Sequence, residues 1–170
     1  MASLIENLIN VLIEQDKEYK ELLNLSKEKT EVIIKGDTDK LREMLSEEQH
    51  YLDKVANLEK NRIEIVNDIA IVLNKDVEYL TVKEIVRLLE GQKKEQQKLA
   101  QARDNLNRTL KDMVKINDMN KRLIEDSLEM IEFNINLINS MKQFPEMANY
   151  SKDASNISIL PGRGGFDAKQ

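Results

Sequence analysis

The sequence predicts an all-α protein. Long antiparallel helices form a helical hairpin or bundle with coiled-coil character, and a flexible tail follows. Three observations predict this class. Apolar residues recur every three or four positions along most of the chain. Charged residues make up 34% of the sequence and aromatic residues 4%, a composition typical of long helices. Both prolines, Pro145 and Pro161, lie after residue 144, together with three of the five glycines. We therefore expect a helical body over residues 1–144 and a polar tail over 145–170.

The first two helices are expected over residues 3–35 and 38–73. Ser3 and Glu6 form a capping box at the start of the first helix. An apolar seam then runs from Ile5 to Ile33, and it weakens at Gln15, Ser26 and Lys29. Gly36 supplies a left-handed residue that ends the helix, and Asp37 or Thr38 caps the next one. A connection this short makes the two helices antiparallel neighbours.

The third helix has the clearest start signal. Thr81 and Glu84 form a capping box, and Leu80 can pack on Ile85 as a hydrophobic staple. This helix is expected over residues 82–90. Gly91 either kinks it or ends it, and the sequence leaves both alternatives open. A last helix is expected over 92–143, because nothing stops a helix between Gly91 and Pro145.

Residues 113–141 carry an apolar face too wide for a simple two-helix seam, with a polar row of Asn120, Ser127 and Asn134 along its middle. In one interpretation the face packs against two neighbouring helices, and buried Asn fixes the register. In the other it is open to a partner helix. Five of the seven methionines lie in or near this stretch, which favours an adaptable binding surface. The candidate binding residues are Ile116, Leu123, Ile124, Leu128, Met130, Ile131, Ile135 and Ile138.

Several classes of function find no support in the sequence. The net charge is −5 without a basic arm, so nucleic acid is not an expected partner. No apolar run approaches the length of about 18 residues needed to span a membrane, and no secretory signal precedes the body, so a cytosolic protein without membrane insertion is expected. The chain has no cysteine and His50 is its single histidine. We therefore expect no cofactor, no metal site and no enzymatic activity.

The chain resembles the FlgN-type flagellar export chaperones. Three groups of residues carry the resemblance, in the same order and spacing: Glu14, Tyr19, Leu22, Leu23 and Gly36-Asp37; Leu58, Glu59 and Arg62; and Asn117, Asn120, Leu123 and Ile124. The resemblance implies a cytosolic chaperone that binds hook–filament junction (hook-associated) proteins and delivers them to the export gate of the type III machine. It also implies a docking role for Tyr150, although Ser151 stands where enteric relatives carry Gly.

The alternative function is that of a structural coiled-coil protein that acts by self-association. The two functions differ in whether the apolar face at 113–141 is filled in the free protein. A strict coiled coil would also sustain its apolar seam through residues 15–33, which this chain does not. Whether the chain forms a homodimer is left open by the sequence.

Overall fold

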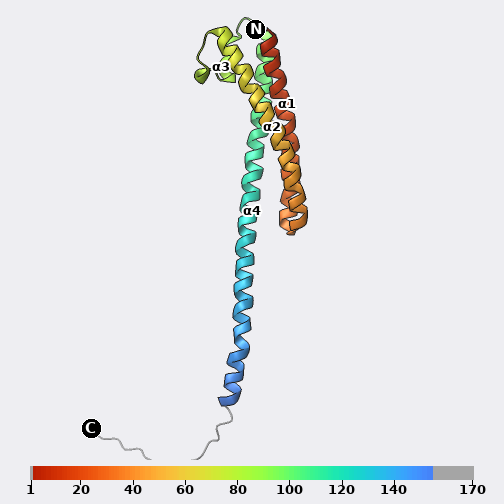
Figure 1. Cartoon of the computed structure of the whole chain (residues 1–170), viewed down its shortest axis with the longest axis vertical. Helices are drawn as coiled ribbons and strands as arrows, with labels where there is room; N and C mark the ends of the chain where they lie inside the picture. Colours follow the sequence, from red (N-terminus) through yellow and green to blue (C-terminus); the bar gives the residue numbers. More distant parts are fainter. Residues whose placement is uncertain (1, 155–170) are drawn as a thin grey trace, which may run out of the picture. The chain divides into compact units, whose positions relative to one another are not determined.

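The structure, a computed structural model, describes the backbone of residues 2–154 and the side chains of residues 3–142. The elements in order are α1 (Ala2–Lys35), α2 (Thr38–Leu73), the short 3-10 helix η1 (Val77–Tyr79), α3 (Val82–Leu88) and α4 (Lys93–Ala154) (Figure 1). No strand occurs among the described residues, and the predicted all-α class is confirmed. The chain divides into two units, residues 1–125 and residues 126–170, which are described separately.

A two-residue connection folds α1 and α2 into the antiparallel hairpin that the sequence predicts. Gly36 has φ 68°, a conformation that costs glycine little. The amides of Gly36 and Asp37 donate to the carbonyls of Ile33 and Val32 at 3.0 and 3.2 Å, which satisfies two free carbonyls at the end of α1. The Asp37 carboxylate then accepts from the Lys40 amide at 3.0 Å and caps α2.

Local signals also set the ends of α2 and α3. Asn74 closes α2 in the left-handed region, with φ 49°. Thr81 is the N-cap of α3, and its hydroxyl accepts from the Glu84 amide at 3.2 Å. Leu80 and Ile85 flank this cap and are both buried in one cluster, as a hydrophobic staple requires. α1 begins at Ala2, so Ser3 lies inside its first turn instead of preceding it.

The helix is interrupted between α3 and α4, so of the two alternatives at Gly91, a kink or an end, the structure shows an end. α3 ends at Leu88, and α4 begins at Lys93 after an irregular link around Gly91. The Gln96 side-chain amide donates to the Val86 carbonyl at 2.9 Å and so ties the two helices together across the link. α4 remains helical as far as Ala154, beyond the expected end at residue 143. Pro145 lacks one amide donor and disfavours a helix interior, but it does not forbid helical backbone on both of its sides.

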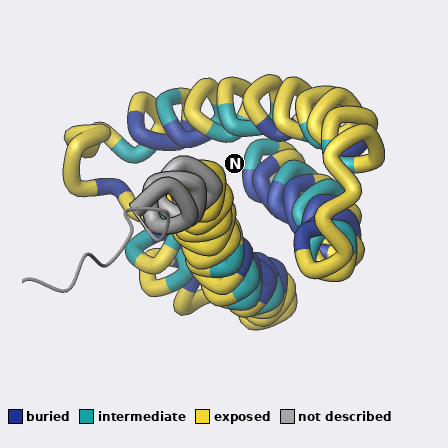
Figure 2. The backbone as a smooth tube through the Cα atoms, turned by 90° about the horizontal axis from the view of Figure 1, so that it is seen from below, coloured by how far each residue is buried: buried dark blue, intermediate teal, exposed yellow. Residues whose placement is uncertain are grey.

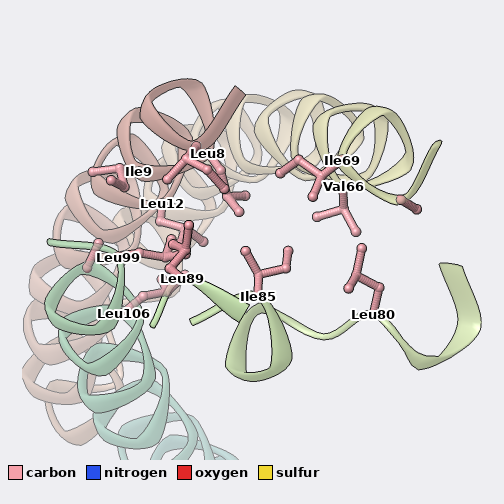
Figure 3. Close-up of a cluster of buried hydrophobic side chains, with 13 residues drawn as sticks. Leu8, Ile9, Leu12, Val66, Ile69, Leu80, Ile85, Leu89, Leu99 and Leu106 are labelled. Carbon is pink, nitrogen blue, oxygen red and sulfur yellow. The ribbon is translucent and has the colours of Figure 1, made fainter. Parts of the chain in front are cut away.

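The main hydrophobic core lies where the first unit brings α1, α2, α3 and the start of α4 together (Figure 3). Leu8, Ile69, Ile85 and Leu99, one from each of the four helices, are at most 1% exposed. Burying a side chain of this size contributes about 1.5–3 kcal/mol. Leu80, at the end of η1, packs into the same cluster and holds the link between α2 and α3 against it.

α1 and the first part of α4 run parallel to each other, because the numbers of the residues that pair between them increase together along both helices. Asp16 accepts from the Thr109 hydroxyl at 2.6 Å, and further along Ser26 lies 3.4 Å from the Asn117 side-chain oxygen. A smaller apolar cluster of Leu22, Leu23, Val55 and Met113 lies along the same length. This pairing gives α1 a second neighbour besides α2.

The positions at which the apolar seam of α1 weakens are polar contacts between helices. The Gln15 amide donates to Glu59 at 3.0 Å, and Lys29 pairs with Glu48 at 2.7 Å. Ser26 is buried, and its carbonyl accepts from Asn120 at 2.8 Å. These residues direct α1 to particular partners on α2 and α4, so the weak middle of the seam is part of the packing.

Candidate partner-binding face

The last described stretch of α4 exposes a run of large apolar side chains. From Ile124 to Lys142 every residue is exposed, and Figure 2 shows this part of the helix in yellow. Leu128 is 60% exposed and Ile131 is 55% exposed. We name seven of the large apolar residues of this stretch within the second unit, all but Phe133, the C-terminal face: Leu128, Met130, Ile131, Ile135, Leu137, Ile138 and Met141.

The predicted binding residues divide between two environments. Ile116 is half-buried against the cluster that contains Met113, and Leu123 is also half-buried. Ile124 is 39% exposed, at the end of the first unit. The other five candidates belong to the C-terminal face: Leu128, Met130, Ile131, Ile135 and Ile138. The interpretation of a face packed against neighbouring helices thus describes its first part, and the interpretation of an open face describes its last part.

The polar row divides in the same way. Asn120 is 3% exposed; its amide donates to the Ser26 carbonyl, and its side-chain oxygen accepts from the Thr30 hydroxyl at 2.5 Å. Both halves of its amide are therefore paired inside the first unit, as expected for a buried Asn that fixes register. Ser127 and Asn134 are exposed.

The seven residues of the C-terminal face form a broad stripe along the helix. At 3.6 residues per turn, Ile131, Ile135 and Ile138 lie within about 60° of one another, and Met130, Leu137 and Met141 border them on one side. Leu128 borders the stripe on the other side. The stripe suits an amphipathic helix that packs lengthwise. Leu137 and Met141 were not among the candidates, although both follow the same seven-residue spacing.

Phe133 was also missed by the sequence analysis. It is 66% exposed and lies beyond the rows of the seven-residue repeat. A search by repeat alone therefore passes over it. The signal that could have found it is its size, because an exposed aromatic ring beside an apolar stripe extends the surface that a partner can cover.

A separate cleft of about 460 Å³, lined by polar and apolar side chains, lies within the first unit, between α1, α2, α3 and α4. Arg62 donates two hydrogen bonds to Glu59, at 2.6 and 2.8 Å, and lowers the pKa of that carboxyl; burial opposes this shift and the Gln15 amide adds to it. Glu59 raises the pKa of Arg62 in turn. Burial, together with the nearby Glu59 charge, raises the pKa of Tyr19. The cleft thus holds an ion pair within α2 and a neutral phenol on α1, and the hydrogen bond from Gln15 to Glu59 ties the two helices together.

The described residues bring together no group of three His, Cys, Asp or Glu side chains that could hold a metal ion. His50 is exposed, and its ring meets the Tyr51 ring edge-on at 6.1 Å. None of the helices in the described part is both long and apolar enough to cross a membrane.

Tyr150, the predicted docking residue, lies within the helical backbone of α4, and its side chain is outside the described residues. The expectation that it follows the last helix was wrong, because α4 continues to Ala154. A residue on a helix projects in a direction set by the helix, whereas a residue on a tail does not. The docking role itself remains a prediction.

Comparison with known proteins relates the sequence of this chain to a family. The family model for the FlgN protein matches residues 1–156, which is nearly the whole chain. The chain is 28% identical, over 143 residues, to a protein of Bacillus subtilis (strain 168) described as uncharacterized protein YvyG; the match covers 84% of this chain and 82% of that protein. No solved structure matches the chain.

Proposed function

This chain belongs to the FlgN family of flagellar export chaperones, and we propose that it binds hook–filament junction proteins through the C-terminal face of α4 and delivers them to the export gate. FlgN proteins act as chaperones and not as enzymes. The family match covers the first unit and extends to residue 156 in the second, so it includes the exposed stretch of α4. The cytosol is the compartment in which such a chaperone meets its cargo before export.

The exposure of the C-terminal face is the observation that supports capture of cargo. Seven large apolar side chains are exposed along a single helix. Apolar area removed from water contributes roughly 25 cal/mol per Å², so covering this stripe with a cargo helix supplies a substantial driving force. Contiguous apolar surface of this kind marks binding sites for other proteins. The methionines at 130 and 141 suit a surface that accepts more than one cargo sequence.

The capture test places a charge within the C-terminal face. Leu128→Asp, Ile131→Asp and Ile135→Asp should each weaken binding of the host's junction proteins more than tenfold, because each removes about 1.5–3 kcal/mol of apolar burial. Isothermal titration calorimetry measures the loss. Circular dichroism and thermal melting should stay nearly unchanged, since these residues are exposed in the free chain.

Asn136→Asp is the matched control. It lies on the same stretch, is exposed, and points away from the stripe. It should bind cargo as the unaltered chain does. Unfolding of the free protein by the charges at 128, 131 or 135 would instead make the face an internal core, and the capture role would be lost.

Delivery is assigned to Tyr150. A tyrosine ring offers a large contact area with little side-chain entropy to lose, and its hydroxyl adds a directional hydrogen bond. Tyr150→Ala should weaken binding to the cytosolic domain of the export gate and leave the affinity for cargo intact, in paired pull-downs with both partners. Truncation after Ala154 keeps the whole of α4 and tests residues 155–170 separately. Loss of cargo binding with unchanged gate binding would reverse the roles of the two regions.

A further inference from the structure

One side of α4 within the first unit carries a row of cations. Arg108, Lys111, Lys115 and Arg122 are all exposed, and we name these four residues the basic stripe. At 100° per residue they lie within about 60° of one another around the helix, and they extend over about 21 Å along it. The stripe lies roughly opposite Met113, which is buried against α1 and α2. It therefore faces away from the packed side of the helix.

The charge of this stretch is opposite to that of the chain. Residues 107–122 contain five basic and two acidic residues, whereas the whole chain contains 26 basic and 31 acidic residues. Of the two acidic residues, Asp112 pairs with Lys115 at 4.0 Å, and Asp118 lies about 20° outside the stripe. Within residues 3–142, no other cation of the stripe forms an ion pair. The stripe is thus a local excess of positive charge on an acidic protein.

An open hollow of about 430 Å³ borders the basic stripe. Its walls are Asn107, Leu110, Lys111, Val114 and Lys115, so two cations of the stripe form one of its edges. The Val114 side chain is 59% exposed, and Leu110 is half-buried beside it. The surface therefore offers apolar contact and positive charge to the same partner.

We propose that this surface binds an acidic segment of another protein. The carboxylates of the segment face the basic stripe, and one of its apolar side chains lies in the hollow against Leu110 and Val114. A single exposed ion pair contributes little, so the affinity depends on several charges that act together. The site consists of first-unit residues and is separate from the C-terminal face, so it adds a second partner to the one in the proposed function.

The charge around the stripe favours a short acidic segment over an extended polyanion. A nucleic acid duplex or an anionic membrane extends well beyond the stripe and meets the rest of the chain. That remainder is acidic, because the net charge is −5 although this stretch is basic. Asp104, which is in line with the stripe around the helix and lies about one turn before it, is exposed. A segment as short as the stripe avoids this repulsion.

The test measures fluorescence anisotropy of labelled peptides of about eight residues, which span ~26 Å when extended and so cover the stripe. The first peptide consists of Glu and Asp around a central Leu. The second has Gln and Asn in place of the acidic residues, and the third keeps the acidic residues but has Ser in place of Leu. With the full chain at low salt, the first should bind at least about tenfold tighter than the second and about threefold tighter than the third. Added salt should weaken its binding.

The double variant Lys111→Gln with Lys115→Gln should weaken binding of the first peptide at least about fivefold, because it neutralises the cations at the hollow. The matched control is Lys17→Gln with Lys27→Gln. It makes the same change in net charge at exposed lysines of α1 that form no ion pair in the described structure. It should bind the peptide as the unaltered chain does. Circular dichroism checks that both variants remain helical.

Several results would overturn the proposal. Equal binding of the first two peptides, or equal loss in the two double variants, would remove the role of the stripe. Equal binding of the first and third peptides would remove the role of the hollow. Tighter binding of a DNA duplex, or of vesicles of phosphatidylcholine and phosphatidylserine, would assign the stripe to that polyanion. A dimer in analytical ultracentrifugation that the Lys111→Gln, Lys115→Gln variant abolishes would make a second copy the occupant.

Leu128→Asp separates this proposal from the proposed function. It alters the C-terminal face and leaves the basic stripe unchanged, so it should bind the first peptide as the unaltered chain does. Loss of peptide binding in this variant would place the peptide on the C-terminal face and overturn the site at the stripe.

Discussion

Two stretches of α4, residues 113–123 and 128–138, carry similar seven-residue patterns of apolar and polar residues in different surroundings. In the first stretch Met113 is buried against α1 and α2, and Asn120 has both halves of its amide paired. In the second stretch Ile131 and Asn134 are exposed. A periodic pattern therefore identifies a helix face that needs covering, but not whether the same chain covers it. The first stretch has hydrogen-bonding partners on a neighbouring helix, because Ser26 and Thr30 of α1 bond to Asn120.

The sharpest test of this comparison truncates one leucine in each environment. Leu99 is 0% exposed and Leu128 is 60% exposed, and both lie on α4. Leu99→Ala should lower the free energy of unfolding by about 2–5 kcal/mol, since it leaves a cavity in the main core. Leu128→Ala should change it by less than about 0.5 kcal/mol. Urea denaturation followed by circular dichroism measures both values. Equal losses would mean that the two leucines share one kind of environment.

A smaller effect is expected from the two asparagines of the polar row. Asn120→Ala removes one donor to the Ser26 carbonyl and one acceptor of the Thr30 hydroxyl. That hydroxyl keeps the Ser26 carbonyl as an acceptor at 3.2 Å, so the cost should lie at the lower end of about 1–3 kcal/mol of stability. Asn134→Ala should be neutral or slightly stabilising, because Ala favours an exposed helix. The same denaturation experiment compares them. A costly Asn134→Ala would show that the second stretch is internally packed.

The smallest effect concerns the Glu59 carboxylate, which pairs with Arg62 at 2.6 Å. Arg62 holds the pKa of Glu59 below the ordinary value of 4.5, so this pair contributes stability above pH 4.5 and loses it as pH falls through the lower folded pKa. Between pH 7 and pH 3 the unaltered chain should lose more stability than Glu59→Gln does. The difference should stay below about 1 kcal/mol, since the Glu59 side chain is 43% exposed.

Glu47→Gln provides the control for that measurement, because Glu47 is exposed and forms no ion pair in the described structure. It should lose stability with falling pH as the unaltered chain does. An identical pH dependence of the Glu59→Gln variant and the unaltered chain would show that the pair with Arg62 adds nothing to stability.

Most of the fold followed from local signals in the sequence. Gly36 with Asp37 set the hairpin, and Thr81 with Leu80 and Ile85 set the start of α3, because caps and turns depend on residues a few positions apart. The end of α4 did not follow, since Pro145 is a statistical stop signal that helical backbone on both sides can override. Single-sequence periodicity also gave no register between helices, so the partners of Gln15, Ser26 and Lys29 were not foreseen.

The candidate site was predicted in part. The sequence located the broad face, and five of its eight candidate residues are in the exposed stretch of the second unit: Leu128, Met130, Ile131, Ile135 and Ile138. It could not exclude Ile116, because the Leu22 cluster that half-buries this side chain comes from parts of the chain far away in sequence.

The parallel pairing of α1 with α4 has a consequence for the order of folding. Its hydrogen bonds join residues 90 to 94 positions apart, whereas the α1–α2 hairpin closes through two residues. Contacts so distant in sequence form slowly, because a long loop must close before they contribute. During synthesis the hairpin emerges first. Asp16 and Ser26 of α1 form their hydrogen bonds to α4 only after α4 has been synthesised. The ribosome therefore releases the exposed stretch of α4 only after the α1–α2 hairpin, against which the first half of α4 packs, has emerged.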